Sequence, residues 1–202
     1  MPKGIPLTQE EITRRRGEIL NAAMSVILRK GFLETSMREI AEAAGVGKST
    51  LYDYFPSKDE IMIAYVVDEV QRLTAQVQTI IAQDLSVTEK FRQIWRNHLE
   101  NMLANKQMYI KISFESQRLS QESQQRINVH RHAYQDMLCK LVEEGIHRGE
   151  FRPVNPLLAI RAMFSLLTPM VYTSRPTGSP EQMLEEALDI MFQGMQSVKP
   201  QE

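Results

Sequence analysis

The sequence has too little cysteine for an internal disulfide and no apolar run long enough to cross a membrane. Its 202 residues include one cysteine, Cys139, which leaves no partner within the chain. No stretch reaches the roughly 18 apolar residues of a membrane-spanning helix. The N-terminal residues MPKGIPLTQEEITRRR also lack the apolar segment of a secretion signal. We therefore expect a cytoplasmic protein without disulfides.

Neither sign of charge is in excess. Lys and Arg number 24 and Asp and Glu number 25, so the net charge argues neither for nor against a nucleic-acid partner. Any basic surface must therefore be local. With 43% hydrophobic residues the chain can bury a sizeable core, as one compact unit or two small ones.

Helical periodicity runs through nearly the whole chain, and no segment alternates as a strand bounded by turns would. Sequence patterns that start helices recur along it. These are Thr8–Glu11, Ser36–Glu39, Ser57–Glu60, Ser86–Glu89, Asn155–Pro156 and Ser179–Gln182. We expect an all-α fold of about nine helices.

The segment AGVGKST, residues 44–50, has two interpretations. As a phosphate-binding loop it needs a glycine five positions before Gly47, and that position is Glu42, whose carboxylate would repel phosphates. Such a loop also follows a buried strand, whereas MREIAEA has helical spacing. Both requirements fail, which disfavours a nucleotide site.

As a helix-turn-helix, the same region meets each requirement. Ala41 allows two short helices to approach closely, Gly45 suits a turn with positive φ, and Leu51 can anchor the second helix. The remaining apolar residues of this small core are Met37, Ile40, Ala44, Val46 and Phe55. A second helix with a polar outer face fits the major groove of DNA.

The stretch TSMREIAEAAGVGKSTLYDYFPSKDEIM resembles the DNA-binding region of the TetR family of transcriptional regulators. The likeness covers about Ile12 to Val67. It implies a nine-helix fold with an N-terminal three-helix helix-turn-helix head and a C-terminal helical domain. It also implies a homodimeric repressor that a small apolar effector releases from a near-palindromic operator. It also implies three segments: an arm at 1–12, a DNA-binding domain at 13–73 with its motif at about 36–55, and a ligand-binding and dimerisation domain at 74–202.

The residues expected to contact double-stranded DNA lie at the start of the first short helix, along the second, and just after it. They are Thr35, Ser36, Arg38, Gly47, Lys48, Ser49, Thr50, Tyr52, Asp53, Tyr54 and Lys58. Lys48 suits a guanine edge, whereas the likeness places Tyr52, Tyr54 and Lys58 at phosphates. Alternatives stay open: Thr35 and Ser36 can be simple caps, Arg38 a solvated arginine, and Tyr54 partly a core residue.

Asp53 departs from similar proteins, which often have a basic, amide or aromatic residue there. An acid beside phosphates costs affinity unless it accepts from cytosine or pairs with a cation, so the base at this position stays open. Arg14, Arg15 and Arg16 can contact the DNA backbone or minor groove, or form a solvated face. Together these cations would supply the salt-dependent part of binding.

The second half has no recognisable motif, so its sites are assigned from the likeness and from apolar spacing. The pocket candidates are Trp95, His98, Met102, Met108, Tyr109, Phe114, Tyr134 and Met137. The dimer-interface candidates, on the last two helices, are Leu157, Ile160, Phe164, Leu167, Val171, Leu184, Leu188, Met191 and Phe192. In each set the alternative is a purely internal role, and His98 in particular can be a hydrogen-bonded core residue.

No spacing nominates a catalytic or metal site. His130 and His132 point to different sides of a helix, and Cys139 lies two turns beyond His132. We therefore expect a regulator that is not an enzyme, with no cofactor and no metal. The alternatives are an all-helical enzyme or carrier with a chance helix-turn-helix, or a nucleotide hydrolase using GVGKST. Repression is the family's usual mode, and activation stays open.

Overall fold

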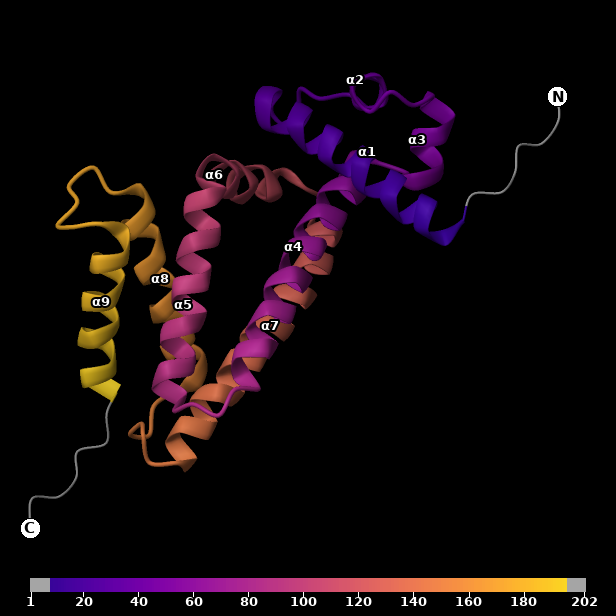
Figure 1. Cartoon of the computed structure of the whole chain (residues 1–202). Helices are drawn as coiled ribbons and strands as arrows, with labels where there is room; N and C mark the ends of the chain where they lie inside the picture. The colour runs from indigo at the N-terminus through magenta and orange to yellow at the C-terminus, as the bar shows by residue number, and fades with distance from the viewer. Residues whose placement is uncertain (1–7, 196–202) are drawn as a thin grey trace, which may run out of the picture. The chain divides into compact units, whose positions relative to one another are not determined.

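The computed structural model describes residues 8–195, and within that range it contains nine α-helices, one short 3-10 helix and no strand (Figure 1). The helices are α1 (Gln9–Lys30), α2 (Met37–Ala43), α3 (Lys48–Tyr54), α4 (Lys58–Ile81), α5 (Val87–Ala104), α6 (Lys106–Glu115), η1 (Ser116–Arg118), α7 (Gln121–His147), α8 (Pro156–Tyr172) and α9 (Pro180–Met195). The prediction of an all-α fold with about nine helices is confirmed.

The helices begin where the capping patterns predicted. Ser36 accepts a hydrogen bond from the Glu39 N–H at 3.2 Å, and the Glu39 carboxylate accepts from the Ser36 N–H at 2.9 Å. Reciprocal pairs of this kind also open α1 at Thr8 and α5 at Ser86. Each box satisfies backbone N–H groups that the first helical turn leaves without partners.

The chain divides into two compact units that are not continuous in sequence. The first unit contains the described residues up to Glu69 together with Ile110–Asn128. The second unit contains Val70–Tyr109 and the described residues from Val129 onward. The expected domains at 13–73 and 74–202 are continuous, so the two descriptions differ in the segment Ile110–Asn128 and in residues 70–73, which belong to the second unit.

Within the first unit, polar side chains hold the segment Ile110–Asn128 against α1 and the start of α4. The Glu115 carboxylate accepts the Phe32 N–H at 3.1 Å. The Asp59 carboxylate accepts the Ser123 hydroxyl at 2.7 Å. Arg126 pairs with Glu60, and this ion pair lowers the pKa of Glu60. Directional polar contacts therefore attach this segment together with two buried apolar side chains, Leu119 and Ile127.

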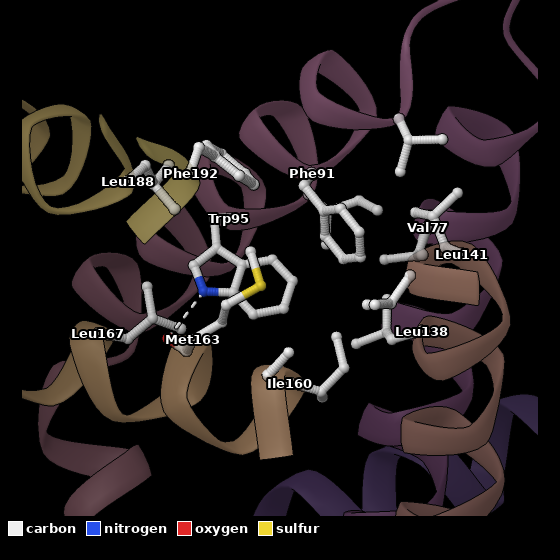
Figure 2. Close-up of a cluster of buried hydrophobic side chains, with 14 of the residues drawn as sticks. Val77, Phe91, Trp95, Leu138, Leu141, Ile160, Met163, Leu167, Leu188 and Phe192 are labelled. Atoms are coloured by element: carbon white, nitrogen blue, oxygen red, sulfur yellow. Dashed lines mark hydrogen bonds between the residues drawn. The ribbon is translucent and has the colours of Figure 1, made fainter. Parts of the chain in front are cut away.

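The second unit is built around a large apolar core contributed by α4, α5, α7, α8 and α9 (Figure 2). Trp95 is fully buried at its centre, and its indole N–H donates to the Met163 carbonyl at 2.9 Å. The Phe91 ring meets the Trp95 ring edge-on, with centroids 5.7 Å apart. Satisfying the indole N–H removes the cost of burying it.

Gly145 on α7 is required by close packing within this core. A Cβ atom at this position would lie 2.5 Å from the Phe151 ring and 3.1 Å from a Val87 methyl. The Phe151 N–H also donates to the Gly145 carbonyl at 3.1 Å. The chain that follows α7 therefore folds directly back onto the helix.

Among residues 8–195 no helix is both long enough and apolar enough to pass through a bilayer.

Candidate nucleic-acid interface and effector cavity

Helices α2 and α3 form a helix-turn-helix around a small apolar core. Gly45 has φ 63°, in the region that favours glycine, and the Val46 N–H donates back to the Ala41 carbonyl at 3.0 Å. Ile40 and Leu51 are completely buried. Residues 47–50 thus follow a helix and open another, so the requirement of a phosphate loop for a preceding strand is not met.

Helix α3 directs a polar face outward. The exposed residues of this segment are Gly47, Lys48, Ser49, Tyr52 and Asp53, and the half-buried ones are Thr50 and Tyr54. The Lys48 ammonium lies 5.8 Å from the centroid of the Tyr52 ring. Leu51 fixes the opposite side of the helix in the core, so the polar residues form one continuous surface.

Asp53 lies on this surface and is exposed. No hydrogen bond or ion pair joins it to another residue between 8 and 195. Its carboxylate is therefore available either to accept from a base edge or to be neutralised by a cation. The base that this position contacts stays a prediction to be tested.

The three residues expected before and at the start of α2 differ in what they can offer to DNA. Thr35 is buried, and its hydroxyl donates to the Gly31 carbonyl at 2.7 Å. The Ser36 hydroxyl is occupied by Glu39 at 2.8 Å. Arg38 is exposed and pairs with Glu42 at 2.8 Å. An exposed ion pair contributes little to stability, so Arg38 can exchange Glu42 for a phosphate at low cost.

Lys58 has an internal role that the sequence did not reveal. Its ammonium donates to the Phe32 carbonyl at 2.6 Å and to the Leu33 carbonyl at 3.3 Å, and it lies 4.8 Å from the Phe32 ring centroid. An ammonium has three N–H donors, which leaves one for a phosphate. Lys58 therefore anchors the α1–α2 loop, and a DNA contact would be additional to this.

The three consecutive arginines of α1, at positions 14–16, are held in different ways. Arg16 pairs with Asp68 at 3.2 Å and lies 5.2 Å from the Phe55 ring centroid. Arg14 pairs with Glu18 at 3.6 Å, and Arg15 is exposed. The structure thus ties Arg16 to the body of the first unit and leaves the other two toward solvent.

A cavity of about 320 Å³ lies within the second unit. Its lining residues are Val70, Leu73, His98, Met102, Tyr109, Arg131, Tyr134, Gln135, Phe164, Leu167 and Thr168. Four of the predicted pocket residues, His98, Met102, Tyr109 and Tyr134, line it together. Of the other four, Trp95 lies in the core beside it, Met108 and Met137 are half-buried outside its lining, and Phe114 is 65% exposed in the first unit.

His98 and Tyr134 form a buried polar pair in the cavity wall. The His98 Nε2 lies 2.6 Å from the Tyr134 hydroxyl. Burial lowers the pKa of His98 from its ordinary 6.5 to about 4, and burial likewise raises the pKa of Tyr134. Both side chains are therefore neutral at neutral pH, and the pair adds hydrogen-bonding capacity but no charge.

The nine interface candidates fall into two groups. Ile160, Leu167, Val171, Leu184, Leu188 and Phe192 are buried in the core of a single chain, whereas Leu157, Phe164 and Met191 are half-buried. A side chain that its own chain already covers has no surface left for a partner. The outward faces of α8 and α9 expose other apolar residues instead, with Leu158 and Ile190 each 67% exposed.

The described residues contain no group of three or more His, Cys, Asp or Glu side chains placed to hold a metal ion. Cys139 is a half-buried free thiol in the same range. Burial and the neighbouring Asp136 raise the pKa of this thiol. The thiol is therefore mostly protonated at neutral pH, which disfavours reactivity as a nucleophile.

Two family models match the chain. One described as bacterial regulatory proteins, tetR family, matches residues 19–65, and one described as tetracyclin repressor-like, C-terminal domain, matches residues 84–195. The second match alone covers more than half of the 202 residues. The first match contains the helix-turn-helix, and the second contains every residue that lines the cavity except Val70 and Leu73.

Individual transcriptional regulators are also similar to this chain over most of its length. An uncharacterized HTH-type transcriptional regulator of Bacillus subtilis, YfiR, is 28% identical over 164 residues, which are 78% of each chain. The HTH-type transcriptional repressor KstR2 of Mycolicibacterium smegmatis is 26% identical over 194 residues, 94% of this chain and 95% of KstR2. The structure of the regulator FadR from Bacillus subtilis, in complex with stearoyl-CoA, matches with a TM-score of 0.77 at 23% identity, over 88% of this chain and 98% of FadR. That last similarity is evidence of the fold.

Proposed function

Because the chain belongs to the TetR family and is a DNA-binding transcriptional regulator, not an enzyme, we propose that it represses transcription from a near-palindromic operator until an apolar effector releases it. The observation that carries this proposal is the polar outer face of α3, backed by the buried Leu51. The site of action is the cytoplasm, where bacterial DNA lies. No feature of the described residues favours the alternative of an enzyme or carrier.

DNA binding is assigned to residues 13–73, with bases contacted by Lys48, Ser49 and Asp53 at the exposed N-terminal half of α3. Tyr52 and Arg38 are assigned to phosphates, since both are exposed beside that face. Because Lys48 and Arg38 would release counter-ions from the DNA, the affinity should fall as the salt concentration rises. The operator's bases are not determined by these assignments.

The homodimer is assigned to the outward faces of α8 and α9. On α8, Leu158, Ala162, Ser165 and Pro169 lie at spacings that place them on one exposed stripe. On α9, the corresponding stripe contains the half-buried Met183 and Ala187 and the exposed Ile190 and Gly194. Two such helices from each of two chains would form a four-helix interface with small residues where the helices approach. Two-fold symmetry then matches a near-palindromic operator.

The effector site is assigned to the cavity within residues 74–202 and its neighbours Val70 and Leu73. Mostly apolar walls with a few polar groups are typical of small-molecule sites. FadR, a protein of the same fold, is known in complex with stearoyl-CoA, which supports an effector with a large apolar part. The effector can change DNA affinity only by binding more tightly to the released state than to the bound state.

The test is selection of bound duplexes from a random pool by the purified chain. We expect a near-palindromic sequence, because two α3 helices related by two-fold symmetry contact equivalent half-sites. Lys48→Ala should weaken binding to the selected site by roughly tenfold or more. Lys140→Ala, a change at an exposed lysine of α7, is the matched control and should leave affinity unchanged. No enrichment at any salt concentration would overturn the assignment.

The direction of regulation needs a separate measurement. A reporter gene placed behind the selected operator should be silent with the protein and active without it. Activation by the protein in place of silencing would contradict repression while leaving DNA binding intact.

A further inference from the structure

Arg131 lies in the wall of the effector cavity without a counter-ion. It is the one charged side chain among the lining residues at neutral pH, since none of them is Asp or Glu and His98 is neutral. No hydrogen bond or ion pair joins Arg131 to any residue of the described range 8–195. The cavity therefore has a net positive charge that the surrounding protein does not neutralise.

The sequence of α7 offers Arg131 no acidic partner on its own helix. Side chains three and four positions away share a helix face, and around Arg131 these are Ile127, Asn128, Tyr134 and Gln135. None is acidic. An intrahelical ion pair of the kind that Arg148 makes with Glu144 is therefore impossible at Arg131.

Two arginines of α5 in the second unit show how a guanidinium is neutralised by an acid from another helix. On α5, Arg92 donates to Glu185 at 2.9 Å, and Arg96 donates to the same carboxylate at 2.6 Å. Both guanidinium groups thus have an acid from α9. Burial alone lowers the pKa of Arg131, and no nearby carboxylate opposes this effect. A partly buried cation without a partner costs free energy, which a bound anion would offset.

The rest of the cavity wall suits an apolar body. Val70, Leu73, Met102, Phe164 and Leu167 line it from α4, α5 and α8. The volume of about 320 Å³ lies at the lower end of the roughly 300–1,000 Å³ found for ligand pockets. The cavity therefore accommodates one compact chain or ring system beside the guanidinium.

We propose that the effector is an amphiphile, an apolar chain or ring system ending in one anionic group, and that the Arg131 guanidinium binds this group. A guanidinium presents two parallel N–H donors to a carboxylate or phosphate, which orients the ligand as well as attracting it. The inference rests on the proposed function, because it takes this cavity as the effector site. The anion is either the carboxylate of a free acid or a phosphate of a conjugated acid such as a coenzyme A thioester.

Calorimetric titration of the full chain tests the charge requirement. The probes are octanoate and decanoate, the alcohols octanol and decanol, and the thioesters octanoyl-CoA and decanoyl-CoA. We expect an acid or its thioester to bind roughly tenfold to hundredfold more tightly than the alcohol of the same length. Equal affinities for the anionic probes and the alcohols, or no binding of any anionic probe, would overturn the proposal.

Variants assign the effect to Arg131. Arg131→Gln should remove the preference for the anionic probes and leave alcohol binding unchanged, whereas Arg131→Lys should retain part of the preference. Lys140→Gln removes a positive charge from an exposed position of the same helix and should change nothing. An unchanged preference in Arg131→Gln would refute the assignment. If that variant does not fold, the comparison of acids with alcohols in the unaltered chain still decides.

The same measurements distinguish a carboxylate from a phosphate as the bound anion. They also distinguish failure of this inference from failure of the proposed function. Tight binding of the free acids indicates a carboxylate, whereas tight binding of the thioesters alone indicates their phosphates. A chain that selects no DNA refutes the proposed function, whatever the titrations give. A chain that binds its operator but shows no dependence on ligand charge refutes this inference alone.

Discussion

Different kinds of contact stabilise the interior of each of the two units. In the first unit, directional polar contacts such as that of Glu115 with the Phe32 N–H hold the segment Ile110–Asn128, and only Leu119 and Ile127 of its apolar side chains are buried. In the second unit, Trp95 and its neighbours form a continuous apolar core. Polar contacts can exchange partners with water at a net cost of about 1 kcal/mol each, whereas a packed core cannot open without a much larger loss. The difference indicates which contacts a regulator can rearrange.

The largest effect is expected from Trp95→Ala in the second unit. Removing a fully buried indole leaves a cavity and a Met163 carbonyl without its donor, at a cost of about 3–5 kcal/mol. Urea denaturation followed by circular dichroism measures the loss. Trp95→Phe keeps most of the ring and should cost less. A loss under about 1 kcal/mol for the alanine variant would contradict a core centred on Trp95.

In the first unit, Leu51→Ala should cost about 2–5 kcal/mol, because this side chain is completely buried between α2 and α3. The same variant should lose DNA binding, since α3 loses its support. Tyr52→Ala is the matched control on the outer face: it should leave the free energy of unfolding within about 0.5 kcal/mol and still weaken DNA binding. If Leu51→Ala unfolds and binds as the unaltered chain does, the core has been misplaced.

Acid should act on the second unit through His98. Its pKa is about 4 in the folded chain and near 6.5 when unfolded, so the unfolded chain binds an extra proton between these values. Stability from this residue is therefore full above about pH 6.5 and falls as the pH drops toward 4, by about 3 kcal/mol in total. His98→Gln should lose less over the same window. Equal acid sensitivity in the two proteins would contradict burial of a neutral imidazole.

The smallest effect is expected at Glu115, which accepts the buried Phe32 N–H. Glu115→Ala leaves that donor without a partner, at a cost of about 1–2 kcal/mol. Glu115→Gln keeps an acceptor oxygen and should cost less. Hydrogen exchange at the Phe32 amide is the sharpest measurement, since it should accelerate in the alanine variant alone. An exchange rate that does not change would show that another group satisfies this amide.

The parts of this fold that the sequence predicted are local. The Ser36–Glu39 capping box joins residues three apart, and the turn at Gly45 needs only the residues around it. A capping box or a positive-φ turn therefore appears in the sequence as a fixed spacing. The all-α fold and the position of α3 followed from such patterns.

The parts that it could not predict depend on distant partners. Lys58 donates to a carbonyl 26 residues earlier, and no spacing rule connects the two. On α8 both faces are apolar, so periodicity could not distinguish buried Ile160 from exposed Leu158. Arg131 was absent from the predicted pocket, because apolar helical spacing gives no signal for a charged side chain that lies in a cavity wall. An arginine with neutral neighbours at every helical contact position is the signal that was available.

The burial of the only tryptophan gives the protein an intrinsic optical reporter of one unit. An indole shielded from water emits at short wavelength, and Trp95 shares the Phe164 ring with the cavity, at a centroid distance of 5.4 Å. Ligand entry should therefore change the emission of Trp95, whereas events at α3 have no indole of their own to report them. Occupancy of the cavity can thus be followed by light without any label, in the same cuvette in which DNA release is monitored by a dye on the operator.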